Sequence, residues 1–227
     1  SGGGERGVSG APPRRRGAAP RRVWTYGRGD ACGPGHLPGC LAGTVREEEA
    51  FRLLQEMIDG GFSGGEEPEH ALARVLLPYL RQDMLDQART AHLRSYRLAK
   101  DNAANLAIIA DHVVFCAVTG NEARALALVE RHLPWLVHDG LDAAAHETAL
   151  ASFALGLDAV AASGHPDTPV RGSDAEELAP VFGAHAGAWT ASELAARAWA
   201  EAEEIRRAVD ERNGTDDYAR PLVRPRA

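Results

Sequence analysis

The stretch from residue 101 to residue 138 constrains the fold more than any other part of this chain. In its first half, apolar side chains recur at steps of three and four: Leu106, Ile109, Ala110, Val113 and Ala117. The second half continues this spacing with Ala125, Val129, His132 and Leu136. Such spacing places side chains on one stripe of a helix. Between the halves, Gly120 and its neighbours tolerate the positive φ of a tight turn. The sequence therefore predicts two antiparallel helices, with the rest of the chain stacked on them.

Composition favours helices throughout the chain. Hydrophobic residues make up 44% of its 227 residues, which is enough for a buried core, but aromatic residues make up only 6%. Alanine is abundant, and alanine combines the best helix propensity with a side chain small enough for close helix packing. Few segments show the alternating β-branched pattern of strands. We therefore expect an all-α protein.

Charge divides the chain into an arm and a body. The formal net charge is -7, yet the first 30 residues carry seven arginines against Glu5 and Asp30. Glycine, proline and arginine dominate residues 1–43, which predicts a flexible arm, either a tether for nucleic acid or a membrane surface or a solvated tail. We expect a helical domain over residues 44–214 and a tail over 215–227. The acidic body argues against nucleic-acid binding by the folded part.

The cysteines favour a reducing compartment and no metal site. Their number is three, which is odd and sparse, so a disulfide framework is not expected. Cys116 lies on an apolar helical face and is predicted to be a core residue. Cys32, His36 and Cys40 could be read as a metal loop, but a structural zinc site needs four ligands. No run of 18 apolar residues could span a membrane. We expect a cytoplasmic protein without metal or cofactor.

Several short patterns predict where helices begin and end. Thr44 to Glu47 and Thr190 to Glu193 both have the spacing of a capping box, and Asn213-Gly214 predicts a left-handed cap. Pro78 is expected to interrupt the helix that begins near residue 68. Residues 85–100 form another amphipathic segment, with one side predicted to carry Leu85, Ala88, His92 and Tyr96.

An internal repeat relates two parts of the chain. At an offset of 37 residues, Leu76 aligns with Val113, Asp83 with Gly120 and Ala88 with Ala125 (for example, 120 - 83 = 37). The repeated unit is a helix, a turn and a second helix. We interpret it as a degenerate repeat of helical hairpins.

This repeat resembles the tetratricopeptide repeat (TPR) family, whose helical hairpins recur about every 34 residues. Gly120 and Ala125 stand where that family places its turn glycine and the close-packing alanine of its second helix. The family's first-helix aromatic and glycine are absent, and Pro134 comes earlier than its closing proline. The resemblance implies antiparallel hairpins stacked as a short TPR-like α-solenoid with a right-handed superhelix. The composition also looks like that of helical-repeat regions in bacterial proteins.

The resemblance implies a non-catalytic scaffold that binds a protein or peptide in a concave groove. In this family the first helix of each pair lines the groove, which gives the following candidate contacts: Arg74, Arg81, Asn105, His112 and His146. Each could equally be a surface residue or a core histidine. Apolar residues of the last predicted helix, Trp199 and Ile205, have no following repeat to cover them, so a homodimer is an open alternative.

Two other functions stay open from the sequence. A ligand- or peptide-sensing domain of a bacterial transcriptional regulator would have a similar helical array, although no DNA-binding module is evident. An enzyme is the alternative from another class. His146-Glu147 begins like the His-Glu-x-x-His motif of zinc proteases, but Leu150 occupies the position of the second histidine. No nucleophile has an evident base beside it, so we predict that the protein is not an enzyme.

Overall fold

The computed structural model describes residues 47–60, 68–138 and 140–214. These residues are helical for the most part, and the only pairing of extended backbone among them is an isolated bridge between Pro169 and Thr190. The predicted all-α class is confirmed. The basic arm, the capping box at Thr44 and the cysteine-rich loop over residues 32–40 lie outside the described residues.

The α-helices in chain order are α2 (Glu47–Gly60), α3 (Glu69–Arg74), α4 (Leu76–Arg81), α5 (Leu85–Ala99), α6 (Leu106–Val118), α7 (Glu122–His132), α8 (Ala143–Ala162), α9 (Ala179–Phe182) and α10 (Ala191–Asn213). Three short 3-10 helices join them: η1 (Ala103–Asn105), η2 (Leu133–Val137) and η3 (Glu176–Leu178). None of the described helices is long and apolar enough to cross a membrane.

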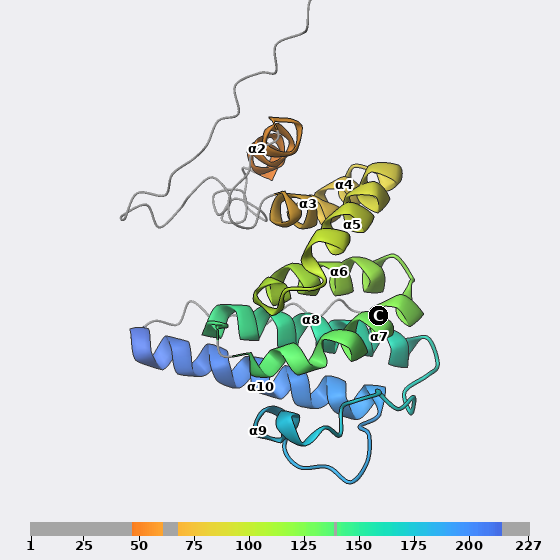
Figure 1. Ribbon diagram of the computed structural model, residues 1–227, viewed down its shortest axis with the longest axis vertical. Coiled ribbons are helices and arrows are strands. Elements are labelled where there is room, and N and C mark those ends of the chain that lie inside the picture. Colours follow the sequence, from red (N-terminus) through yellow and green to blue (C-terminus); the bar gives the residue numbers. More distant parts are fainter. Residues whose placement is uncertain (1–46, 61–67, 139, 215–227) are drawn as a thin grey trace, which may run out of the picture.

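The helices follow one another through the molecule in pairs (Figure 1). α5 packs on α3 and α4, α7 packs on α6, and α10 packs on α8. α6 and α8 lie against each other and join the pairs, while α2 packs on α3 at one end. A single core of buried apolar side chains runs through all these layers, from Leu54 in α2 to Ala202 in α10.

The hairpin predicted from residues 101–138 is present as α6 and α7. α6 ends at a turn in which Gly120 has a φ of 70°, and the backbone N–H of Asn121 donates to the carbonyl of Cys116 at 2.9 Å. Cys116 is buried, as predicted. The second arm ends earlier than its apolar stripe, because Pro134 lies near the start of the 3-10 helix η2.

Local sequence signals also set other helix boundaries. α3 and α4 are separated at Val75, and this break confirms the interruption predicted from Pro78, whose missing N–H cannot bond the carbonyl four residues earlier. Thr190 and Glu193 form the predicted capping box at the start of α10. Gly214 closes that helix in the left-handed conformation, which is also confirmed.

Side chains of α8 cover the last helix within a single chain. Trp199 in α10 is only 6% exposed, and its indole N–H donates to Asp158 Oδ2 of α8 at 2.8 Å. Ile205 is partly buried against the same core. Trp199 therefore needs no second copy of the chain to cover it, although its lack of a following repeat was the reason for leaving a homodimer open.

Candidate functional site: a buried histidine network and the outer face of α5

The five residues predicted to line a groove occupy different environments. Asn105 and His112 are buried, at 4% and 0% exposure, rather than presented to a partner. Arg74 is partly buried between α3 and α6, where it contacts His70 at 3.3 Å and Asp111 at 3.7 Å. Burial raises the pKa of Asp111, and Arg74 opposes this effect. The exposed Arg81 ends α4.

His146 lies apart from the other four predicted residues. It is near the start of α8, half-buried, and its Nε2 bonds the carbonyl of Leu136 in η2. Because a carbonyl can only accept, the imidazole donates this hydrogen bond. The contact ties α8 to the preceding 3-10 helix. The structure therefore does not gather the five predicted residues into one exposed surface.

His112 instead belongs to a buried polar chain that links α3, α5 and α6. Its Nδ1 lies 3.0 Å from Nδ1 of His92, and its Nε2 lies 3.0 Å from Oγ of Ser95. Oγ of Ser95 also lies 2.7 Å from the main-chain oxygen of Glu69. His92, Ser95 and His112 are all less than 9% exposed. The hydrogen bonds of this network are therefore shielded from water.

Counting protons fixes the direction of each bond in this chain. The oxygen of Glu69 can only accept, so the hydroxyl proton of Ser95 points to it. Ser95 Oγ must then accept from His112, whose Nε2 carries the proton. In a neutral ring, Nδ1 of His112 is left as an acceptor, so Nδ1 of His92 donates to it. With both imidazoles neutral, each hydrogen bond of the network therefore has one donor and one acceptor.

The electrostatics agree with neutral histidines. Burial, together with the positive charge of Arg124, lowers the pKa of His92 to about 4. Burial likewise lowers the pKa of His112 to about 3, with His92, Arg124 and His132 acting in the same direction. A charged imidazole in this apolar interior would lose its hydration without gaining a carboxylate partner. Both histidines are therefore neutral at pH 7.

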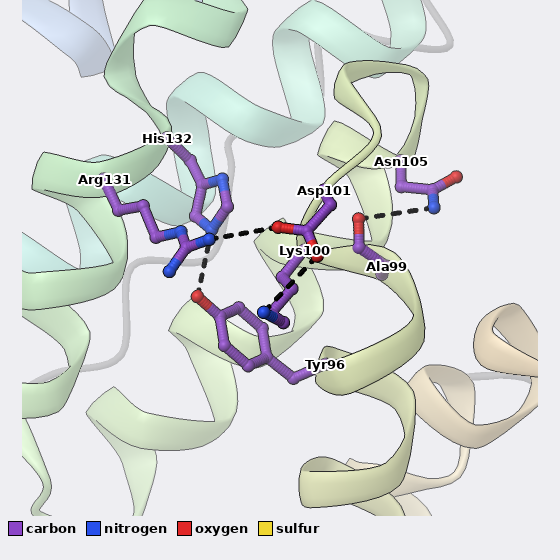
Figure 2. A network of polar contacts seen from close by, with 7 residues as sticks. All are labelled: Tyr96, Ala99, Lys100, Asp101, Asn105, Arg131 and His132. Carbon is purple, nitrogen blue, oxygen red and sulfur yellow. Dashed lines mark hydrogen bonds and ion pairs between the residues drawn. The ribbon is translucent and has the colours of Figure 1, made fainter.

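A second polar group joins the ends of α5 and α7 (Figure 2). The hydroxyl of Tyr96 lies 3.2 Å from Nε2 of His132, and Asp101 bridges Lys100 at 3.3 Å and Arg131 at 3.2 Å. Burial, reinforced mainly by Arg131, lowers the pKa of His132 to about 4. These contacts hold the end of α5 against the second arm of the central hairpin.

The other ring nitrogen of His132, Nδ1, has no hydrogen-bond partner, and His132 is buried. On the outside, the guanidinium of Arg124 lies 5.0 Å from the centre of the Tyr96 ring, a cation–π contact. Tyr96 is thus held from both sides, by an imidazole within the core and by a cation at the surface.

This buried network is suited to structure rather than to catalysis. The Ser95 hydroxyl donates to a main-chain carbonyl and not to a base, so nothing activates it as a nucleophile. Burial raises the pKa of the Cys116 thiol to about 11, which keeps it protonated and unreactive. Across the described ranges, no three His, Cys, Asp or Glu side chains are grouped to hold a metal ion. What the network does is fix the inner face of α5.

The outer face of α5 carries the residues that sequence reasoning missed. Leu85, Leu93 and Leu98 are exposed by 57%, 54% and 48%. We predicted that Leu85 would face inwards, but the helix begins at this residue, where the neighbouring helices do not cover it. The spacing of the sequence contained a signal for this exposed side. Leucine and arginine alternate at steps of four outside the buried stripe, at Leu85, Arg89, Leu93 and Arg97.

A shallow depression lies beside this face. It has a volume of about 350 Å³, is open to solvent, and is lined by Ile58, Leu72, Tyr79, Asp86, Gln87, Thr90, Ala91 and Arg94. The apolar part of its wall comes from α2, α3 and α4, and its polar part from α5. The Tyr79 hydroxyl at its edge donates to Gln55 Oε1 at 2.7 Å. Such an open hollow is suited to a side chain of a partner rather than to an enclosed small molecule.

No protein-family model, curated protein or solved structure matches this chain.

Proposed function

We propose that the protein is a non-catalytic helical scaffold that binds a protein or peptide partner. In this proposal the pairs α3/α4 with α5, α6 with α7, and α8 with α10 are successive hairpins of a short TPR-like solenoid with a right-handed superhelix. The packing of each pair on the next supports that interpretation. Stacked hairpins offer long surfaces to extended or helical partners, which is why repeat proteins of this kind commonly serve in binding.

The observation that carries the proposal is the exposed leucine set on α5, formed by Leu85, Leu93 and Leu98. An isolated exposed leucine needs no explanation, but three on one helix beside an open depression form a surface typical of recognition. Asn105 and His112 contribute to the core instead. Of the residues first expected to bind, Arg81 is the exposed one and remains part of the proposed contact surface.

A site-specific crosslinking experiment tests this function. A photoreactive phenylalanine analogue replaces Leu93 in the full chain, and in separate variants replaces Arg81 or Ala200, an exposed position on α10. We expect light to produce one discrete adduct from position 93 in cells of the source organism, and mass spectrometry to identify the peptide attached. Equal, diffuse labelling from all three positions would contradict a binding function.

A further inference from the structure

Two rows of alternating chemistry run along the exposed side of α5. Leu85, Arg89, Leu93 and Arg97 follow one another at steps of four, so each is turned by about 40° from the one before and the row winds around the exposed side of the helix. Arg94, which lines the depression, and Leu98, four residues later, lie beside this row and are also exposed. The solvent-exposed side of α5 therefore carries three arginines and three leucines.

The three arginines have no carboxylate partner among the described residues, unlike several other arginines of that part of the chain. Arg89, Arg94 and Arg97 are exposed and form no ion pair or hydrogen bond with any described residue. By contrast, several arginines elsewhere pair with a glutamate or aspartate, as in the 2.6 Å contact of Arg171 with Glu130. The exposed side of α5 thus carries three arginines that no carboxylate of the described residues neutralises.

We infer that the outer face of α5 is a docking surface for an acidic amphipathic helix of a partner protein. This inference rests on the proposed binding function. It specifies which surface of the protein binds and which class of ligand is bound. Carboxylates of the partner would pair with Arg89, Arg94 and Arg97, while its apolar stripe would cover Leu93 and Leu98. An apolar anchor of the partner fits the depression between Leu72 and Arg94.

Charge and composition favour a protein helix over other polyanions. Asp86 lies on the same face and would repel a nucleic-acid backbone, whereas a peptide can place a neutral residue opposite it. No aromatic side chain is exposed on α5 for base stacking. A membrane surface would require a continuous apolar stripe, and here arginine and leucine alternate.

The buried network prepares this face for binding. His92, Ser95 and Tyr96 hold the inner side of α5 by hydrogen bonds to α3, α6 and α7. Because the helix is already fixed, a partner does not have to order it, and little binding free energy is lost to conformational entropy. The exposed side chains can then vary without disturbing the fold, which makes the surface testable by substitution.

The test is a selection of peptide ligands by the full chain. A displayed library of random peptides of about 16 residues, long enough for four helical turns, is enriched on the immobilised protein. Affinities of the enriched peptides are then measured by fluorescence anisotropy. Wild type is compared with the charge-reversed Arg89→Glu/Arg94→Glu/Arg97→Glu variant and with a control that reverses two exposed arginines of α10, Arg207→Glu/Arg212→Glu. A further variant, Leu93→Ser/Leu98→Ser, removes two exposed leucines of α5. Its control, Val118→Ser/Val137→Ser, removes two exposed valines elsewhere in the chain.

We expect enriched peptides to carry Asp or Glu beside Leu or Phe at helical spacing. Charge reversal on α5 should weaken them by about tenfold or more, and the α10 control by less than about twofold. Equal affinity for all variants would overturn the α5 surface and leave a binding function in place. Absence of any enriched peptide would contradict both the α5 surface and the proposed binding function. Binding at α5 of a single-stranded RNA or of vesicles with anionic lipid, without peptide binding, would overturn the assigned ligand class.

Discussion

Ser95 is the residue on which the buried chain of hydrogen bonds depends. Its hydroxyl donates to Glu69 and accepts from His112, so both of its polar functions are used. Ser95→Ala would leave the imidazole N–H of His112 buried without an acceptor. The cost of such an unsatisfied group is about 1–3 kcal/mol of unfolding free energy. Urea denaturation at pH 7 measures this loss.

Ser152 provides the matched control for this substitution. It is also buried, in α8, but its side-chain hydroxyl forms no hydrogen bond with any described residue. Ser152→Ala is therefore expected to change the unfolding free energy by less than about 0.5 kcal/mol. Equal effects of the two substitutions would show that the hydrogen bonds of Ser95 contribute nothing beyond its packing.

The buried histidines make stability depend on pH. In the folded chain the pKa values of His92 and His132 are about 4 and that of His112 about 3, against 6.5 when unfolded. Below pH 6.5 the unfolded chain therefore binds more protons. The stability is complete above that pH and is lost as pH falls towards 4, at a rate on the order of 1 kcal/mol per pH unit for each histidine.

Unfolding by urea between pH 7 and pH 5 checks this dependence, because carboxylates contribute less in that window. His132→Leu removes one of the three titrating groups, so it should reduce the pH dependence by about a third. A wild-type stability that stays constant across this window would refute the assignment of neutral, buried imidazoles.

The burial of His112 was predictable from its helix, and of the two alternatives left open by the sequence, a partner contact and a core histidine, the structure shows the second. α6 is apolar on nearly every side, and Ile108, Val113 and Phe115 are all buried. A helix that is hydrophobic all round is buried between neighbours, so a histidine within it belongs to the core. The bonds from His112 to Ser95 and His92 were not predictable, because they join α6 to another helix 17 and 20 residues away.

At the scale of the helices, Gly156 fixes how closely α8 approaches the central hairpin. A Cβ atom added to this glycine would lie 2.6 Å from Cγ1 of Val113 in α6. Valine is branched at Cβ and cannot easily rotate away. Gly156→Ala should therefore destabilise the protein by about 1–3 kcal/mol, even though alanine is the better helix former.

A double-mutant cycle with Val113→Ala isolates this contact. Removing the valine methyl groups creates space for the new Cβ, so the double variant should be more stable than the sum of the two single losses predicts, by about 0.5–3 kcal/mol. Thermal and urea unfolding of the four proteins provide the measurement. Additive losses would mean that the close approach of α8 to α6 does not depend on this glycine.

Features within one helix could be predicted from the sequence, whereas contacts between helices could not. The capping box at Thr190, the left-handed Gly214 and the break before Pro78 each depend on residues a few positions apart. Gly156 gives no such local signal, because its need for a missing side chain comes from Val113, 43 positions earlier. The exposed residues of α5 were predictable only in part. Their spacing could be read from the sequence, but their exposure depends on which neighbouring helices cover α5.

At the scale of the molecule, the order of the layers predicts an uneven distribution of stability. α6 and α8 contact helices on both sides, whereas α2 packs mainly on α3 at one end. In an array where each layer contacts only its neighbours, local opening begins at the ends. Hydrogen exchange measured by mass spectrometry should therefore be slowest in α6 and α8 and fastest in α2.

Two core substitutions separate a layered array from a single cooperative unit. Leu72→Ala in α3 and Ile109→Ala in α6 each remove a buried side chain, at a cost of about 2–5 kcal/mol. The first should accelerate exchange in α2 to α5 and leave α8 and α10 nearly unchanged, while the second should accelerate it throughout. If Leu72→Ala accelerated exchange equally everywhere, the chain would unfold as one unit. The helix pairs would then lack the independence expected of stacked repeats.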